Sequence, residues 1–288
     1  MRAPHLYGYL HLALVVLLSY LPAMAPCPAA VSGKTQYGTV DPTLSMAWRA
    51  CLKGRKVLFM GNSVTRHWLF DVAFLLRGSE DNSSNSRAKE KKICGHGAVR
   101  GDGQGCQLRL HGATLNYTWM WDIHGDIMQR VLTRERVDYL VFNVGSNDVL
   151  DGTLRKGWYR RQKSKAPMLA ELMANISLGG TDIYYRTSTH VCKHGWGKTK
   201  EQYNFLLRQS NHLIKYYLQL PLLTTLDTFK WTKNCFGYED FVHHSKASID
   251  HVLAWASFVC PRVREFVLAN CTNATIFYKD ADSTRESD

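Results

Sequence analysis

The chain has 288 residues, of which 45% are apolar and 21% charged, values ordinary for one large globular domain. They exclude a chain of low complexity, apart from a polar stretch over residues 78–92. The formal charge of +12 suits an acidic glycan or an anionic membrane, and it equally suits a solvated surface with no special partner.

The N-terminal 25 residues are expected to lie outside the fold. Arg2 precedes an apolar stretch over Leu10–Leu21, and Ala23-Met24-Ala25 matches the small-x-small pattern of a signal-peptide cleavage site. The stretch is short for a membrane span, which needs about 20 apolar residues. We therefore predict a cleaved signal peptide over residues 1–25. The alternative is a short Golgi-type anchor that tethers the chain to the membrane.

Both alternatives place the chain in the secretory pathway, secreted or in the Golgi lumen, and two further features agree. Eight cysteines suggest disulfides in an oxidising compartment, and near neighbours such as Cys94/Cys106 or Cys260/Cys271 are candidate pairs. A glycosylated lumenal protein is not expected to bind nucleic acid. Acceptor sequons for N-glycosylation begin at Asn82, Asn116, Asn175, Asn270 and Asn273.

Strand and helix patterns alternate along the rest of the chain. Strand-like runs are 56–60, 137–144, 182–187 and 222–226, and helical patterns are 64–77, 167–176, 200–218 and 246–268 with a break near Pro261. A hairpin is predicted over Leu108–Trp121, turning at His111-Gly112-Ala113, and residues 78–105 are expected to form a surface loop. This alternation predicts an α/β three-layer sandwich with a mainly parallel sheet over residues 45–275, followed by a tail at 276–288.

The first strand pattern ends at a glycine, and a serine follows just before a helical pattern. Gly61-Asn62-Ser63 has this layout, and Gly61 suits a sharp turn. The amides and dipole at the start of the helix would stabilise negative charge, so Ser63 is a candidate nucleophile and its amide a candidate oxyanion donor. An ordinary N-cap serine has the same local pattern.

Two later blocks could complete a catalytic site. Asn147 follows the strand run 137–144, where ligands bind in open α/β sheets, and its amide could donate to an oxyanion. Asp240 stands three residues before His243 and could orient its ring, so that His243 takes the proton of Ser63. Each block alone also fits an ordinary polar turn. Rival residues nearby are His244, Asp250 and His251.

Together the blocks Gly61-Asn62-Ser63, Gly145-Ser146-Asn147-Asp148 and Asp240-Phe241-Val242-His243 resemble those of the SGNH/GDSL hydrolases. Residues 61–66 and 183–190 also resemble the Gly-Asp-Ser-x-x-Arg and Arg-Thr-x-x-x-His motifs of the PC-esterase branch. That branch includes trichome-birefringence-like polysaccharide O-acetyltransferases and the lumenal part of sialic-acid and capsule O-acetylation proteins. The resemblance extends from about Leu52 to Cys260. Asn62 departs from the family's Asp, which performs no chemistry.

The resemblance implies acyl-ester chemistry on a glycan or polysaccharide, through an acyl-enzyme on Ser63. Transfer and hydrolysis share this intermediate, so the direction stays open, and a catalytically inactive glycan-binding module on the same fold is the alternative. No cofactor is expected, although a transferase needs an acyl donor. Arg66, Arg186 and His190 become candidate substrate-binding residues. Candidates for a second oxyanion glycine are Gly101, Gly103, Gly105 and Gly125.

Two other groups of residues have more than one interpretation. His190, Cys192 and His194 have a metal-ligand spacing, but we expect no metal because Cys192 suits a disulfide and His190 belongs to the family-like strand end. Trp158 and Tyr159 could stack on a sugar ring or pack under a loop.

Overall fold

The computed structural model describes residues 31–32, 39–78, 84–99, 101–123, 125–134, 136–144, 157–193, 199–219, 223–233, 235 and 245–270. Its centre is a six-stranded sheet with the strand order β4-β5-β3-β6-β7-β8, in which every neighbouring pair is parallel except β4 with β5. The bounds are β3 (Lys56–Gly61), β4 (Gly105–Leu110), β5 (Ala113–Trp119), β6 (Tyr139–Phe142), β7 (Asp182–Arg186) and β8 (Leu223–Leu226). A separate antiparallel pair is formed by β1 (Val31–Ser32) and β2 (Thr39–Val40).

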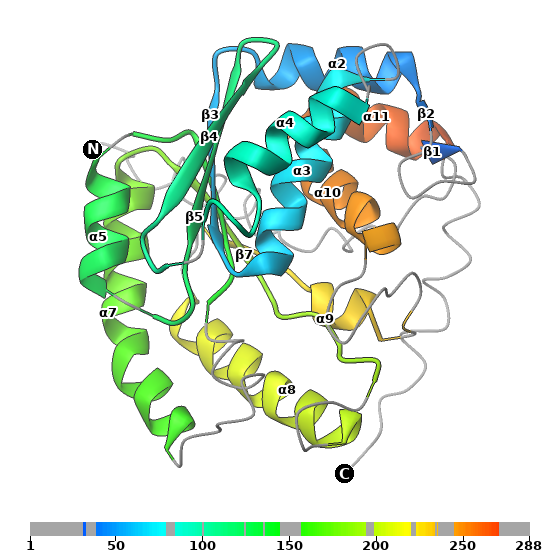
Figure 1. Ribbon diagram of the computed structural model, residues 1–288. Helices are drawn as coiled ribbons and strands as arrows, with labels where there is room; N and C mark the ends of the chain where they lie inside the picture. Colours follow the sequence, from blue (N-terminus) through cyan, green and yellow to red (C-terminus); the bar gives the residue numbers. More distant parts are fainter. Residues whose placement is uncertain are drawn as a thin grey trace, which may run out of the picture.

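Helices cover both faces of the sheet (Figure 1). One face carries α2 (Pro42–Leu52), α3 (Ser63–Arg77), α4 (Ser84–Cys94), α10 (Ser245–Val259) and α11 (Pro261–Asn270). The other carries α5 (Gly125–Arg134), α7 (Trp158–Leu178) and α8 (Lys200–Tyr217), while the short α9 (Thr228–Trp231) follows β8. The predicted α/β three-layer fold with a mainly parallel sheet is confirmed.

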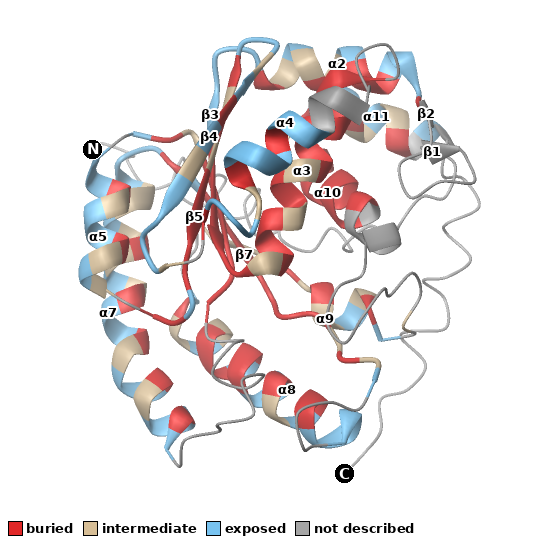
Figure 2. Cartoon of the chain, viewed as in Figure 1, coloured by how far each residue is buried: buried red, intermediate tan, exposed pale blue. Residues whose placement is uncertain are grey.

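The side chains of β3 alternate between two apolar cores, one on each face of the sheet. Val57 and Phe59 belong to the core under α3 and α10, whereas Leu58 and Met60 belong to the core under α5 and α7. Figure 2 shows the central strands, and much of the helices that pack on them, in the red of buried residues. A strand that is buried on both faces reads as a continuous apolar run, which explains why the pattern at 56–60 was readable from the sequence.

The predicted hairpin is confirmed as β4 and β5. Its two turn residues, His111 and Gly112, have positive φ angles of 49° and 80°, as the tightest hairpin turns require. The hairpin places β4 at the edge of the sheet, and β5 pairs in parallel with β3. The break between the last two helices is also confirmed, because α10 ends at Val259 and Pro261 is the first residue of α11.

Two expectations about local structure were wrong. Residues 84–94 form α4 instead of a loop, and Glu90 of this helix is buried in an ion pair with Arg77 at 3.0 Å. The helix expected at 167–176 begins already at Trp158 and runs through Pro167. A buried stripe at helical spacing holds the earlier turns against the fold, and it consists of Trp158, Gln162, Ala166, Leu169 and Met173.

Three disulfides join described cysteines. The expected pair Cys94–Cys106 is present. The expected pair Cys260/Cys271 is wrong, because Cys260 is bonded to Cys51 across a sequence separation of 209 residues. Helices α2 and α11 lie together on one face, so these cysteines are neighbours in space although they are far apart in sequence. The third bond joins Cys192 to Cys235. Cys271 lies outside the described residues.

Candidate active site

Ser63 is the first residue of α3 and lies two residues after Gly61, the carboxyl end of β3. The turn between them requires glycine: Gly61 has a φ of +155°, and a Cβ there would lie 2.7 Å from the carbonyl oxygen of Asn143. Asn62 is the N-cap, since its side-chain oxygen accepts the Val64 amide at 3.1 Å. Asn62 therefore performs the capping that an Asp would perform, and the partly exposed Ser63 is presented at the start of a 15-residue helix.

The backbone of this turn is fixed from the neighbouring strand β5. The Tyr117 hydroxyl lies 2.8 Å from the Gly61 carbonyl oxygen and 3.1 Å from that of Asn62. The Met120 amide donates to the same Gly61 oxygen at 3.0 Å. Burial raises the pKa of the Tyr117 hydroxyl well above its usual value, so this hydroxyl stays a donor at any physiological pH. Sequence reasoning missed Tyr117, because nothing local links it to a turn 55 residues earlier.

Asn143 joins the carboxyl ends of three parallel strands at one edge of the sheet. It follows β6, its amide donates to the Met60 carbonyl of β3 at 2.9 Å, and its side chain donates to the Arg186 carbonyl of β7 at 2.8 Å. The block beginning at Asn143 therefore starts beside the turn that carries Ser63, as expected for an open α/β sheet. The predicted site residues Asn147, Asp240 and His243 lie outside the described residues, as does His244.

Two buried arginines lie near the first turns of α3. Arg186, at the end of β7, is 1% exposed; its Nη2 lies 3.3 Å from the Thr65 hydroxyl and its guanidinium 5.6 Å from the Trp68 ring centroid. Among the described residues, its Nε and Nη1 have no hydrogen-bond partner, and burial lowers its pKa to about 9. Arg66 is 5% exposed and lies 5.3 Å from the Trp119 ring.

Burial also lowers the pKa of Arg66, whose Nη1 donates to the Val99 carbonyl at 3.4 Å. Within the part of the chain that the structure describes, no carboxylate forms an ion pair with either arginine. The two buried cations, for which the described residues supply no carboxylate, and a helix N-terminus thus favour negative charge near Ser63. Such an environment suits an oxyanion or an anionic ligand.

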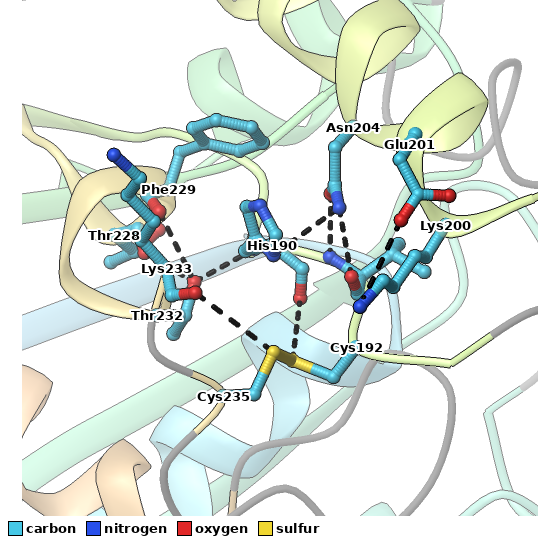
Figure 3. The surroundings of a disulfide bond; sticks show 11 residues. His190, Cys192, Lys200, Glu201, Asn204, Thr228, Phe229, Thr232, Lys233 and Cys235 are labelled. Atoms are coloured by element: carbon cyan, nitrogen blue, oxygen red, sulfur yellow. Dashed lines mark hydrogen bonds and ion pairs between the residues drawn. A yellow bond between two sulfur atoms is a disulfide. The ribbon is translucent and has the colours of Figure 1, made fainter.

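His190 lies in the loop after β7, which helix α8 holds in place (Figure 3). The Asn204 side chain accepts the Val191 amide at 2.7 Å and donates to the Val191 carbonyl at 2.8 Å, which fixes its orientation. Its nitrogen therefore donates to His190 Nδ1 at 3.2 Å. In the neutral ring the proton must then reside on Nε2. In this tautomer Nδ1 of His190 is the acceptor and Nε2 carries the N–H.

The metal-ligand spacing at His190 has a structural explanation. His190, Cys192 and Cys235 bring their ligand atoms within 4.8 Å of one another, yet the two sulfur atoms are joined in a disulfide (Figure 3). A disulfide sulfur is not the thiolate that metals bind. The expectation that Cys192 belongs to a disulfide is confirmed, whereas His194 lies outside the described residues.

The remaining candidates occupy varied settings. Trp158 is buried in a small core with Val191 and Tyr203, so it packs inside the protein. Asn175 is exposed on α7, and Asn116 is half-buried within β5; Asn82 and Asn273 lie outside the described residues, as does the side chain of Asn270. Among the described residues, no helix combines the length and the apolar character that a membrane span needs.

The amides of two candidate oxyanion glycines already have partners. Gly101 donates to the Gln104 side-chain oxygen at 3.0 Å, and Gly103 donates to the Trp119 carbonyl at 2.9 Å. Gly105 lies within β4, and Gly125 begins α5 on the opposite face of the sheet from α3. Among these glycines, the described contacts therefore single out none as an oxyanion donor.

No protein-family model and no curated protein matches this chain. Solved structures show distant likenesses. A catalytic mutant of Axe2, an acetylxylan esterase from Geobacillus stearothermophilus, is 14% identical over 72% of this chain and 94% of its own, with a TM-score of 0.45. LAE5, an α/β hydrolase from the Lake Arreo metagenome, is 12% identical over 72% and 95%, with a TM-score of 0.47.

A GDSL-like lipase from Bacteroides thetaiotaomicron is 12% identical over 75% of this chain and 97% of its own, with a TM-score of 0.43. Likenesses of this size assign neither a family nor an activity to the chain. The site is therefore interpreted from its own geometry: a partly exposed serine on a fixed strand–helix turn, in a positively charged setting at the carboxyl edge of a parallel sheet.

Proposed function

We propose that this protein carries out serine-dependent acyl-ester chemistry on a glycan, through an acyl-enzyme on Ser63. The observation that carries the proposal is the position of Ser63, at the N-terminus of α3 on a turn that only Gly61 can make. A serine in this position has helix amides beside it to stabilise negative charge. The buried cations Arg66 and Arg186 add to the same field. A plain N-cap serine is not the explanation, because Asn62 already occupies the N-cap.

In the proposed mechanism His243, oriented by Asp240, takes the proton of the Ser63 hydroxyl as its oxygen attacks the acyl carbonyl. The Ser63 amide and the Asn147 side chain donate to the resulting oxyanion. His243 then protonates the departing alcohol, which leaves the acyl group on Ser63. In the second half, water or a sugar hydroxyl gives its proton to His243 and attacks the acyl-enzyme, and His243 passes that proton to the Ser63 oxygen as the acyl bond to it breaks.

The described residues that flank the Asp240–His243 segment support these roles. Before it, Cys235 is bonded to Cys192 in the loop that follows the carboxyl end of β7. After it, helix α10 packs against α3, the helix that Ser63 begins. The two ends of the segment are thus attached to elements that adjoin the candidate site. The block containing Asn147 likewise starts at Asn143, which is bonded to β3 and β7.

A glycan substrate rests on the resemblance in the motifs and on the inferred compartment. A signal peptide or anchor over residues 1–25 and several sequons favour the secretory pathway, where the chain would be secreted or lie in the Golgi lumen. Three disulfides among the described cysteines fit the same oxidising compartment. The positive setting of Ser63 suits an acidic glycan, and no cofactor is required beyond an acyl donor if the enzyme is a transferase.

Labelling with a fluorophosphonate probe tests the nucleophile. The wild-type protein should bind the probe covalently, and Ser63→Ala should lose the label, whereas Ser164→Ala, an exposed serine on α7, should keep it. Equal labelling of Ser63→Ala would overturn the proposal. Acetyl release from an O-acetylated oligosaccharide, measured beside acetyl transfer to an unacetylated one, then separates an esterase from a transferase. Glycan binding without Ser63-dependent turnover would instead indicate the inactive module.

A further inference from the structure

Trp121 is an exposed aromatic side chain at the edge of the sheet that carries Ser63. It follows β5 by two residues and is 42% exposed. Its ring stacks on that of the buried Trp119, with centroids 6.1 Å apart and planes inclined by 26°. Trp119 in turn lies 5.3 Å from the guanidinium of Arg66. The exposed indole of Trp121 therefore covers the buried Trp119 ring, which in turn lies against Arg66.

The backbone on both sides of Trp121 is tightly held. The Trp121 amide donates to the Asp102 carboxylate, and the preceding Met120 amide donates to the Gly61 carbonyl at 3.0 Å. On the other side, Asp122 is ion-paired with Lys165 at 2.7 Å. Leaving the apolar surface of a tryptophan exposed to water is unfavourable in free energy. Here that surface is kept in one place by several polar contacts, which is what a preorganised binding surface requires.

Trp121 emerges next to the turn that presents Ser63. Residue Trp119 is the register partner of Gly61 in the parallel pair of β5 and β3, and neighbouring strands lie about 4.8 Å apart. The segments that follow β5 and β3 leave the sheet at the same edge, the first toward Trp121 and the second toward Ser63. The Met120–Gly61 hydrogen bond joins the two segments directly. A substrate whose ester lies at Ser63 would thus extend naturally toward this ring.

We propose that Trp121 is a stacking platform for a pyranose ring of the substrate, next to the sugar whose ester reacts at Ser63. This rests on the proposed function. The C–H groups on one face of a pyranose carry slight positive charge and are attracted to the negative face of an indole. The charged groups beside Trp121, which are Asp102 and the Asp122–Lys165 pair, suit a ring edged with hydroxyl groups better than a lipid chain. Trp121 would therefore select glycan esters over small esters.

The test compares two substrates in matched variants. Trp121→Ala should lower kcat/KM for O-acetylated xylo-oligosaccharides and O-acetylated sialyllactose about tenfold, mainly through KM, and should leave ethyl acetate hydrolysis within about twofold. Trp121→Phe should keep most of the oligosaccharide activity. Tyr216→Ala removes another exposed aromatic, on the outer side of α8, and should change neither substrate.

A binding measurement separates this proposal from the proposed function. In the Ser63→Ala background, which cannot turn over, Trp121→Ala should weaken oligosaccharide binding about tenfold by calorimetry. Unchanged binding and turnover in Trp121→Ala would overturn the platform, and so would an equal loss on ethyl acetate, which would indicate a structural role. Failure of the proposed function has a different signature, because activity on both substrates would then survive in Ser63→Ala.

Discussion

Replacing Arg186 by methionine should leave the protein about as stable as it was. In most proteins, breaking a buried ion pair is costly, because it strands the partner charge and loses about 3–5 kcal/mol. Arg186 differs, since its described contacts are the Thr65 hydroxyl and the Trp68 ring. Methionine fills similar space without a charge, and its introduction strands no carboxylate among the described residues. We therefore expect a small change in the free energy of unfolding, where replacing a buried arginine would usually give a large one.

The magnitude follows from the contacts. A pKa lowered from 12.5 to about 9 corresponds to a cost of about 5 kcal/mol for keeping the charge buried. Two contacts offset this cost: the cation–π contact with Trp68 contributes about 2 kcal/mol, and the hydrogen bond to Thr65 contributes about 1.5–3 kcal/mol. These contributions nearly cancel. We expect the free energy of unfolding of Arg186→Met to lie within about 2 kcal/mol of wild type.

Arg77 provides the matched control. It is also buried on α3, but it forms an ion pair with the buried Glu90 at 3.0 Å. Arg77→Met should lose about 3–5 kcal/mol, or about 6–20 °C in Tm, because it removes the buried cation that pairs with that carboxylate. Thermal unfolding of both variants measures the difference. A loss in Arg186→Met as large as that in Arg77→Met would refute the reasoning, since it would reveal an anionic partner for Arg186.

The pH dependence and the activity give two further readouts for Arg186. Because its pKa is lower in the folded than in the unfolded state, its burial cost is full below about pH 9 and falls as pH rises above that value. The stability of wild type relative to Arg186→Met should therefore increase above pH 9. The Arg186 Nη2 lies 3.3 Å from the hydroxyl of Thr65, two residues after Ser63 on α3, which puts its charge within roughly 10 Å of Ser63. Loss of a positive charge at that distance should slow acylation of Ser63 about tenfold.

Three other predictions concern the frame of the site. Gly61→Ala should lower the free energy of unfolding in urea by about 1–3 kcal/mol and abolish probe labelling, because the φ of +155° strains a non-glycine residue and the new Cβ would clash with the Asn143 carbonyl. Normal labelling would contradict this. Tyr117→Phe removes the donor to two carbonyls of the turn and should cost about 1–3 kcal/mol with slower labelling, and an unchanged rate would count against its role. Replacing Cys51 and Cys260 by serine opens a loop of 209 residues and should cost about 2–5 kcal/mol by thermal unfolding, whereas an unaltered Tm would show that this bond adds no stability.

The turn at Ser63 could be predicted from the sequence because its signals are local. A buried run, a glycine and an amphipathic helix stand next to one another at 56–77, and the structure places β3 and α3 within one residue of the predicted bounds. The β4–β5 hairpin was readable for the same reason, through its His111-Gly112 turn. Such elements can be predicted from adjacent residues alone, without knowing which distant segments are in contact.

Features that depend on distant contacts were not predictable. Cys51 pairs with Cys260 only because α2 and α11 share a face of the sheet. The early turns of α7 are held by burial of Trp158, which local propensity around Pro167 does not reveal. That no described carboxylate pairs with Arg186 is likewise a property of the folded state, because the sequence shows which charges exist and not which of them meet.

Tyr117 and Trp121 were missed for a related reason. Tyr117 matters because β5 pairs with β3, and Trp121 because its strand ends beside Ser63. The roles of Asn147, Asp240 and His243 stay predictions, carried by motif order and by the attachment of their neighbours to β7 and α3.

The most direct test of the central claim is mass spectrometry of the protein after reaction with a fluorophosphonate probe. A single covalent adduct should form on the intact protein, and fragmentation of the modified peptide should locate it on Ser63. Ser63→Ala should show no adduct, while Arg186→Met should form the same adduct more slowly. An adduct on another residue, or an equal adduct in Ser63→Ala, would contradict the account.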